Sequence, residues 1–144
     1  MSAGSITKNP IIQKLLSLNL PSGDFAVFGS GPIFAHGLKD SLRDLDLIAR
    51  GAAWEKAKML GNVEETKLKF GEVVLFDEEI SVFNGWFPAG KWNIDELIDS
   101  AEVIEGIRFV RLEEVLKWKR MRNAPKDAEH IRLIEEYFKE KTKI

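Results

Sequence analysis

Asp44 and Asp46 are the residues whose type and spacing point most directly to chemistry. They alternate with Leu45 and Leu47 in the segment RDLDLIA, so on a strand both carboxylates share one face while the leucines enter the core. Two like charges placed this way repel each other, and a divalent cation removes that repulsion. Mg²⁺ prefers oxygen ligands completed by substrate phosphates. The pair therefore predicts a magnesium site, and the alternative is a half-exposed strand with a polar face.

A glycine-rich turn precedes the aspartates. The apolar run 25–28 stops at Gly29, Ser30 and Gly31, and Pro32 follows, an order typical of a strand that leads into a helix. Proline suits a first helical turn because its missing N–H would be unpaired there. The remaining free N–H groups and the positive end of the helix dipole attract phosphate. We expect Gly29 and Ser30 to bind phosphate, with a plain tight turn as the alternative.

The same glycines also open the dinucleotide-binding pattern G-x-G-x-x-G. In that pattern the third glycine allows the helix to pack closely. Phe34 occupies the third position here, and Pro32 interrupts the motif. The dinucleotide interpretation is therefore the weaker of the two.

Periodicity predicts the elements that must hold these residues. A helix begins after Asn9, another spans 52–60, and a short one follows Asn93. Strand patterns cover 67–70, 72–76 and 80–83, and two further strands flank the Glu105-Gly106 turn. We expect one domain over residues 1–144, with frayed ends at 1–8 and 140–144.

Composition excludes several classes of function. The chain has 144 residues, no cysteine and a net charge of −2. Disulfides, zinc-thiolate sites and thiol nucleophiles are excluded by the absence of cysteine, and the charge argues against general nucleic-acid binding. No apolar run approaches the roughly 20 residues of a membrane-spanning helix, and the first ten residues lack the apolar core of a signal peptide. We expect a cytoplasmic protein without a membrane partner.

The order of the turn and the aspartates resembles a known signature. An apolar strand ends in Gly29 and Ser30, thirteen residues follow, and Asp44 and Asp46 come next, as in the DNA polymerase beta-like nucleotidyltransferase superfamily. The resemblance implies an α/β (α+β) fold with a small mixed sheet flanked by helices. It also implies nucleotidyl transfer from a nucleoside triphosphate with Mg²⁺. In this interpretation the aspartates are catalytic metal ligands, and Gly29 and Ser30 bind the nucleotide.

The helix expected from Leu112 carries a lysine on its apolar face. Lys119 falls near the centre of the face defined by Leu112, Val115 and Leu116. A lysine in that position needs a partner. Either a carboxylate satisfies it or its stem extends to solvent, and the functional alternative is a cation directed at a nucleotide phosphate.

Segment 112–131 is similar to the C-terminal stretch of one superfamily branch, which includes abortive-infection and toxin-type nucleotidyltransferases. That similarity implies that Lys119 is catalytic and that Lys119, Lys126 and Asp127 bind the nucleotide. Asp127 shares a face with apolar residues, so it is expected to point inward and hold Lys119. His130 stands where the branch often carries a second aspartate, and both His36 and His130 are interpreted as structural. Five cations of this region suit a triphosphate or a nucleic-acid end, with an ordinary solvated face as the alternative: Lys117, Lys119, Arg120, Arg122 and Lys126.

The third carboxylate that the superfamily usually carries on a later strand is missing. Ser81 occupies its expected position before 82–86, and a hydroxyl is a far weaker metal ligand and base than a carboxylate. Glu79 is the alternative acid, unless it lies in a surface turn. Two functions stay open. One is metal-dependent nucleotidyl transfer to an unknown acceptor, protein or RNA, and the other is a catalytically impaired nucleotide- or partner-binding protein, for example a toxin–antitoxin component.

Overall fold

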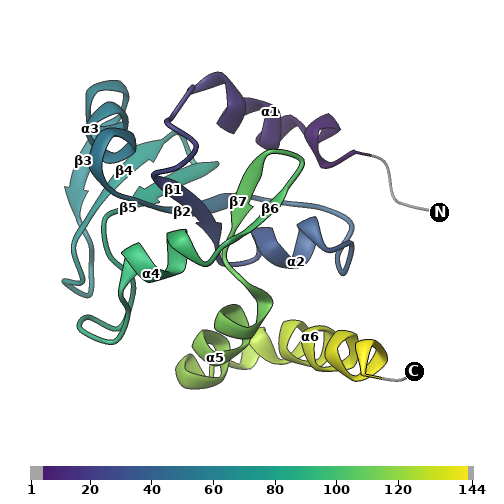
Figure 1. Cartoon of the computed structure of the whole chain (residues 1–144). Coiled ribbons are helices and arrows are strands. Elements are labelled where there is room, and N and C mark those ends of the chain that lie inside the picture. Colours follow the sequence, from purple (N-terminus) through teal and green to yellow (C-terminus); the bar gives the residue numbers. More distant parts are fainter. Residues whose placement is uncertain (1–4, 143–144) are drawn as a thin grey trace.

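A seven-stranded mixed sheet forms the centre of the computed structural model, which describes residues 5–142 (Figure 1). The strands are β1 (Phe25–Phe28), β2 (Leu45–Ala49), β3 (Asn62–Glu65), β4 (Glu72–Phe76), β5 (Ile80–Phe83), β6 (Glu102–Ile104) and β7 (Ile107–Phe109). Their order across the sheet is β3-β4-β5-β2-β1-β7-β6. The pairs β2/β5 and β1/β7 are parallel and the others antiparallel. The expectation of a mixed sheet flanked by helices is confirmed at this level.

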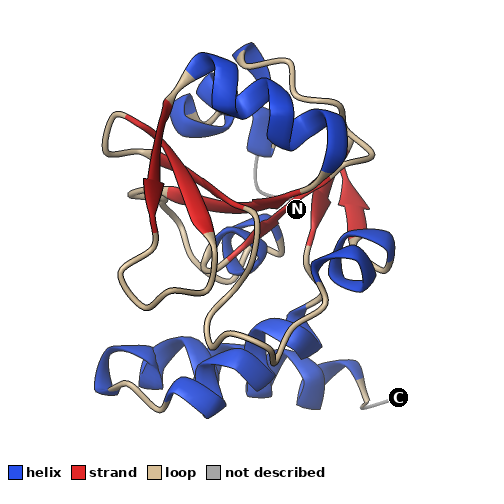
Figure 2. Cartoon of the chain, turned by 90° about the vertical axis from the view of Figure 1, so that its left-hand side faces the viewer, coloured by secondary structure: helices blue, strands red, loops and turns tan. Residues whose placement is uncertain are grey.

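Helices cover both faces of the sheet (Figure 2). They are α1 (Pro10–Ser17), α2 (Gly31–Ala35), α3 (Gly51–Leu60), α4 (Ile94–Asp99), α5 (Leu112–Arg122) and α6 (Ala128–Lys141), with the 3-10 turns η1 (Ile6–Lys8) and η2 (Pro125–Asp127). The caps expected from the sequence form, since Asn9 accepts hydrogen bonds at the start of α1 and Asn93 at the start of α4. No helix of residues 5–142 is long and apolar enough to cross a membrane.

The sheet separates two apolar cores. Helices α1 and α3 pack on one face, and α4, α5 and α6 pack on the other. Leu45 and Leu47 of β2 enter the first core, whereas Ile48 enters the second. Asp46 therefore lies on the face that carries α5 and α6, as the alternation of leucine and aspartate predicted.

An aromatic cluster fixes α5 beneath the end of β1. Phe28, the last residue of β1, stacks on Trp86 with ring centroids 4.3 Å apart and lies 5.6 Å from the ring of Trp118 on α5. The rings of Trp86 and Trp118 are themselves 5.1 Å apart. Because the chain turns at Gly29 directly after Phe28, this packing brings the middle of α5 close to that turn.

Two local expectations are wrong. Residues 67–70 form a turn rather than a strand, because the Thr66 hydroxyl accepts a hydrogen bond from the Phe70 N–H and closes the loop. The strand lies earlier, in β3, whose exposed polar sequence lacks an apolar pattern.

At the N-terminal end, where fraying was expected, η1 is ordered and Ile6 is buried. The C-terminal helix α6 continues to Lys141; residues 1–4 and 143–144 of the expected frayed ends lie outside the described residues.

Candidate functional site

One cleft of about 460 Å³ collects the residues that the sequence analysis assigned to catalysis, metal binding or nucleotide binding. It lies where the turn after β1 and the entry to β2 meet α5, η2 and α6. The sequence-predicted residues that line it are Gly29, Ser30, Asp44, Asp46, Lys119, Lys126 and Asp127. Five more residues line it as well: Lys39, Arg43, Trp118, Arg122 and His130.

The turn after β1 permits a close approach to the acidic residues. Gly29 has a φ of +65°, and a Cβ atom there would lie 3.2 Å from Asp46 Oδ2. Two residues later, a Cβ on Gly31 would lie only 2.2 Å from Val27 Cγ1, so a side chain there requires backbone movement. Ser30 precedes α2 but makes no side-chain capping bond. The sequence thus needs both glycines to bring this turn against the strand that carries Asp46.

The carboxylates of Asp44 and Asp46 interact as the sequence predicted. Burial, and after it the neighbouring charge of Asp44, raise the pKa of Asp46 to about 6. Arg122, Lys119 and Lys126 oppose that shift. At neutral pH the cleft therefore holds a half-buried anion whose charge is unfavourable without a cation beside it.

Ser81 lies directly beside Asp46. The two residues are partners in the parallel pair of β2 and β5, so their side chains emerge on the same face. Glu79 lies just before β5 and forms an ion pair with Lys14 on α1, whose Nζ atom is 3.0 Å from Glu79 Oε1. Neither Ser81 nor Glu79 is among the residues that line the cleft, but only Ser81 is paired with Asp46. The position next to Asp46 is thus a hydroxyl, and the alternative placement of Glu79 there is wrong.

On the opposite wall, Asp127 holds two cations in fixed positions. Its side chain is 2% exposed and accepts a hydrogen bond from Lys119 Nζ at 3.0 Å. Arg122 donates to both of its oxygens, at 2.8 and 2.7 Å, and the guanidinium lies 4.2 Å from the centre of the Trp118 ring. The predicted inward orientation of Asp127 and its contact with Lys119 are confirmed.

The pKa values of this pair follow from burial and from the ion pairs. Burial alone would raise the pKa of Asp127, but the hydrogen bonds from Arg122 and Lys119 outweigh it and lower the pKa to about 2. Burial lowers the pKa of Lys119, and the charge of Asp127 opposes this shift. Because Asp127 stays ionised and buried, it keeps both cations oriented, and its pair with the buried Lys119 is little screened by solvent.

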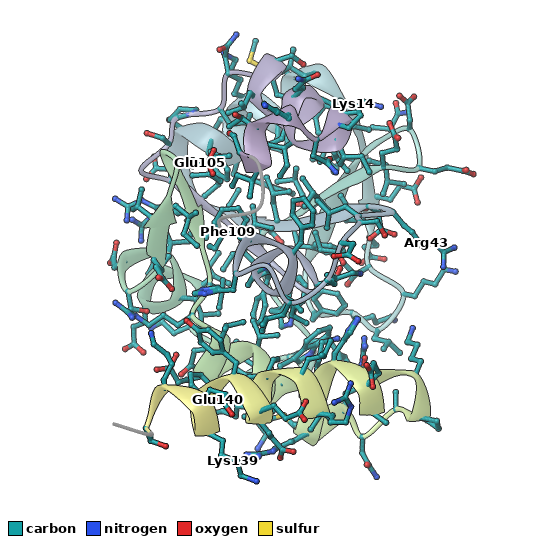
Figure 3. All side chains as sticks on the ribbon, turned by 90° about the vertical axis from the view of Figure 1, so that its right-hand side faces the viewer. Lys14, Arg43, Glu105, Phe109, Lys139 and Glu140 are labelled. Atoms are coloured by element: carbon teal, nitrogen blue, oxygen red, sulfur yellow. The ribbon has the colours of Figure 1, made fainter. Side chains whose placement is uncertain are left out.

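Three further cations form the rim of the cleft: Lys39, Arg43 and Lys126. Within residues 5–142 none of the three has an ion pair or a side-chain hydrogen bond. Arg43 and Lys126 are exposed, and Figure 3 shows Arg43 extending outward from the body of the molecule. The rim therefore offers positive charge that no carboxylate of residues 5–142 pairs with.

The basic segment 117–126 divides between the cleft and the surface. Lys117 forms an ion pair with Glu114, and Arg120 forms one with Glu135; neither lines the cleft. Lys119 and Arg122 are three residues apart on α5 and share a face. Helical spacing could therefore have identified Arg122 from the sequence, whereas Lys39, Arg43 and Trp118 gave no local signal.

The acidic residues suit a metal ion that takes most of its ligands from elsewhere. Residues 5–142 contain no group of three or more His, Cys, Asp or Glu side chains that could hold a metal ion alone. Asp44 and Asp46 supply two carboxylates, and the raised pKa of Asp46 reflects a charge that a cation would stabilise. Two carboxylates completed by water and phosphate oxygens form an ordinary Mg²⁺ environment, so the residues fit this ion.

Searches against protein-family models, curated proteins and solved structures find no match for this chain. The fold and the cleft together define an α/β protein with a mixed sheet and a mixed-charge site dominated by cations. The functional argument therefore rests on the residues of the cleft.

Proposed function

We propose that the cleft binds a nucleoside triphosphate together with Mg²⁺ and that the protein transfers a nucleotidyl group, as its resemblance to the polymerase beta-like nucleotidyltransferases implies. One observation carries the proposal. The chain has a net charge of −2, yet this cleft is lined by five Lys and Arg side chains against three aspartates. Cations gathered on low-dielectric walls raise the local concentration of a polyanion.

The two kinds of cation support different tasks. Lys119 and Arg122 are held by Asp127, so they are fixed before any ligand arrives. Fixed charges directed at developing negative charge lower a reaction barrier without reorganisation. Lys39, Arg43 and Lys126 at the rim have no protein partner within residues 5–142, so they suit the terminal phosphates of a triphosphate. This division favours a polyphosphate over a single phosphate.

In the proposed mechanism, Asp44 and Asp46 would hold Mg²⁺, which when bound neutralises charge on the phosphates. Gly29 lies close enough to Asp46 that the backbone of the turn and a carboxylate can meet one ligand. Trp118 forms an apolar wall behind Lys119 and Arg122. That wall keeps the local dielectric low and strengthens the charge interactions.

A specific observation favours a second candidate function. Ser81 lies beside Asp46 where a third carboxylate would accept the proton of the acceptor hydroxyl. General-base assistance typically contributes about 10²–10⁴-fold, and a neutral hydroxyl does not supply it. The second candidate is therefore a protein that binds the nucleotide or a partner and transfers slowly or not at all.

Titration calorimetry tests the binding proposal. Each of the four common nucleoside triphosphates is titrated into the protein, once with Mg²⁺ and once with a chelator. We expect appreciably tighter binding with Mg²⁺ for at least one triphosphate, and we expect the double variant Asp44→Asn, Asp46→Asn to lose that metal dependence while staying folded. Equal or absent binding under both conditions for all four triphosphates would refute the nucleotide function.

Labelled-nucleotide incorporation then separates the two candidate functions. The protein is incubated with the triphosphate that binds and with protein, RNA or small-molecule mixtures as acceptors. Incorporation that Asp46→Asn abolishes supports transfer. Tight binding without incorporation supports the impaired binding protein.

A further inference from the structure

His130 lines the candidate cleft, although the sequence interpretation treats it as structural. It lies in the first turn of α6, three residues after Asp127. Its Nδ1 atom is buried and has no hydrogen-bond partner within residues 5–142. The other ring nitrogen, Nε2, is not among the buried atoms that lack a partner. A buried ring nitrogen without an acceptor disfavours the charged imidazolium form in the free protein.

The charges around His130 come from four elements. Burial lowers the pKa of the imidazole, and so do Lys119 of α5 and Lys39 from the segment between α2 and β2. Asp127 of η2 and Glu129 of α6 act in the opposite direction but do not outweigh them. At neutral pH the imidazole is therefore neutral, and it faces a cleft in which cations outnumber carboxylates.

From the position of His130 in a cleft where Lys and Arg side chains outnumber carboxylates, we propose that it is a phosphate-binding residue that takes up a proton when a polyphosphate enters. A polyphosphate offsets the positive charge of Lys39 and Lys119, and one of its oxygens accepts a hydrogen bond from Nε2. Both effects favour the imidazolium form. One proton moves from solvent to the ring, and no covalent bond of the ligand changes. This inference rests on the proposed polyphosphate cleft and adds a proton-coupled ligand to it.

The chain is well suited to a direct test because it contains only two histidines. His36 is the matched control. It contacts Glu102 at 3.0 Å and the ring of Tyr137, and it does not line the cleft. The imidazole signals of both residues are followed by NMR from pH 5 to pH 8.5, and the variants His36→Asn and His130→Asn assign them. The probe is inorganic tripolyphosphate with a chelator, so that metal binding at Asp44 and Asp46 does not contribute.

We expect saturating tripolyphosphate to raise the titration midpoint of the His130 signal by about one pH unit or more, and not to move that of His36. One unit corresponds to about tenfold tighter binding by the protonated form. His130→Asn should then weaken tripolyphosphate binding more at pH 6 than at pH 8, and His36→Asn should leave it unchanged.

The outcomes separate this inference from the function beneath it. If tripolyphosphate binds and the His130 midpoint does not rise, the inference is wrong and the polyphosphate cleft stands. If tripolyphosphate fails to bind, the inference is wrong, and if triphosphates with Mg²⁺ also fail to bind, the proposed function is wrong too. If His130→Asn unfolds, the NMR titration of the unmodified protein still decides the question.

Discussion

Replacing Asp127 by asparagine tests the arrangement on which the cationic wall depends. The side chain keeps its shape but loses its charge, and Lys119 and Arg122 lose the carboxylate that both contact. Lys119 is only 3% exposed, so it cannot turn to solvent without local rearrangement. Removing one member of a buried ion pair costs roughly 3–5 kcal/mol because the remaining charge is uncompensated. We expect a loss of that size in the free energy of unfolding at pH 7.

The same prediction has a definite pH dependence. The pKa of Asp127 is about 2 in the folded protein against an ordinary value of 3.8, a difference worth about 2.5 kcal/mol. Because the folded pKa is the lower one, this stability is present above pH 3.8 and is lost as the pH falls toward 2. Roughly half is lost by pH 3. The difference between wild type and Asp127→Asn should therefore shrink by about 1 kcal/mol from pH 7 to pH 3.

Urea denaturation followed by tryptophan fluorescence measures both quantities, since the chain has four tryptophans. Glu129→Gln is the matched control, because Glu129 lies two residues away and its ion pair with Arg132 is on the surface. It should change stability little at either pH. The reasoning about Asp127 fails if its variant is as stable as wild type at pH 7. It also fails if the loss is the same at pH 7 and pH 3.

Three further predictions concern the cleft. Asp46→Asn should raise the free energy of unfolding by up to about 3 kcal/mol at pH 7 without metal, because the folded protein binds the ionised carboxylate less favourably than the unfolded chain does. The gain should vanish below pH 3.8, where the carboxyl is protonated in both states, and thermal unfolding at pH 7 and below pH 3.8 measures it. Lys119→Met should weaken triphosphate binding by roughly 1–3 kcal/mol in calorimetry, whereas Lys117→Met, on the surface of the same helix, should not. Ser81→Asp should raise any weak incorporation of labelled nucleotide, up to about 10²–10⁴-fold, and unchanged incorporation would show that the missing base is not limiting.

Local patterns predicted the strand-borne part of the site. The alternation of aspartate and leucine in 44–47 predicts that the face of the strand carrying the leucines is buried. Leu45 and Leu47 are indeed buried. The pairing of Ser81 with Asp46 does not follow from such patterns, because a shift of two residues between β2 and β5 would leave the same faces buried; only the superfamily resemblance indicated this place for Ser81. Asp127 was placed inward correctly because helical periodicity sets the face of a residue even when its partner is unknown.

The rim cations show what local patterns cannot supply. Lys39 and Arg43 lie in an irregular segment between α2 and β2, where no period relates a side chain to a face. Their place in the cleft depends on how α5 and α6 pack against the end of β1, which is set by the contacts among Phe28, Trp86 and Trp118. Those residues are distant in sequence, so the packing is a tertiary property.

The arrangement of the cleft also implies that binding and transfer are separable in this protein. The cations that would bind a polyphosphate lie on α5, on η2 and at the rim, whereas proton transfer from an acceptor would occur beside Asp46, where β5 contributes Ser81. A change at Ser81 therefore leaves the cationic wall intact and alters only the position of the missing base. If transfer occurs at an ordinary rate in the unmodified protein, the proton acceptor must be a group other than Ser81 or Glu79, because Ser81 is a neutral hydroxyl and Glu79 is held by Lys14 away from the cleft.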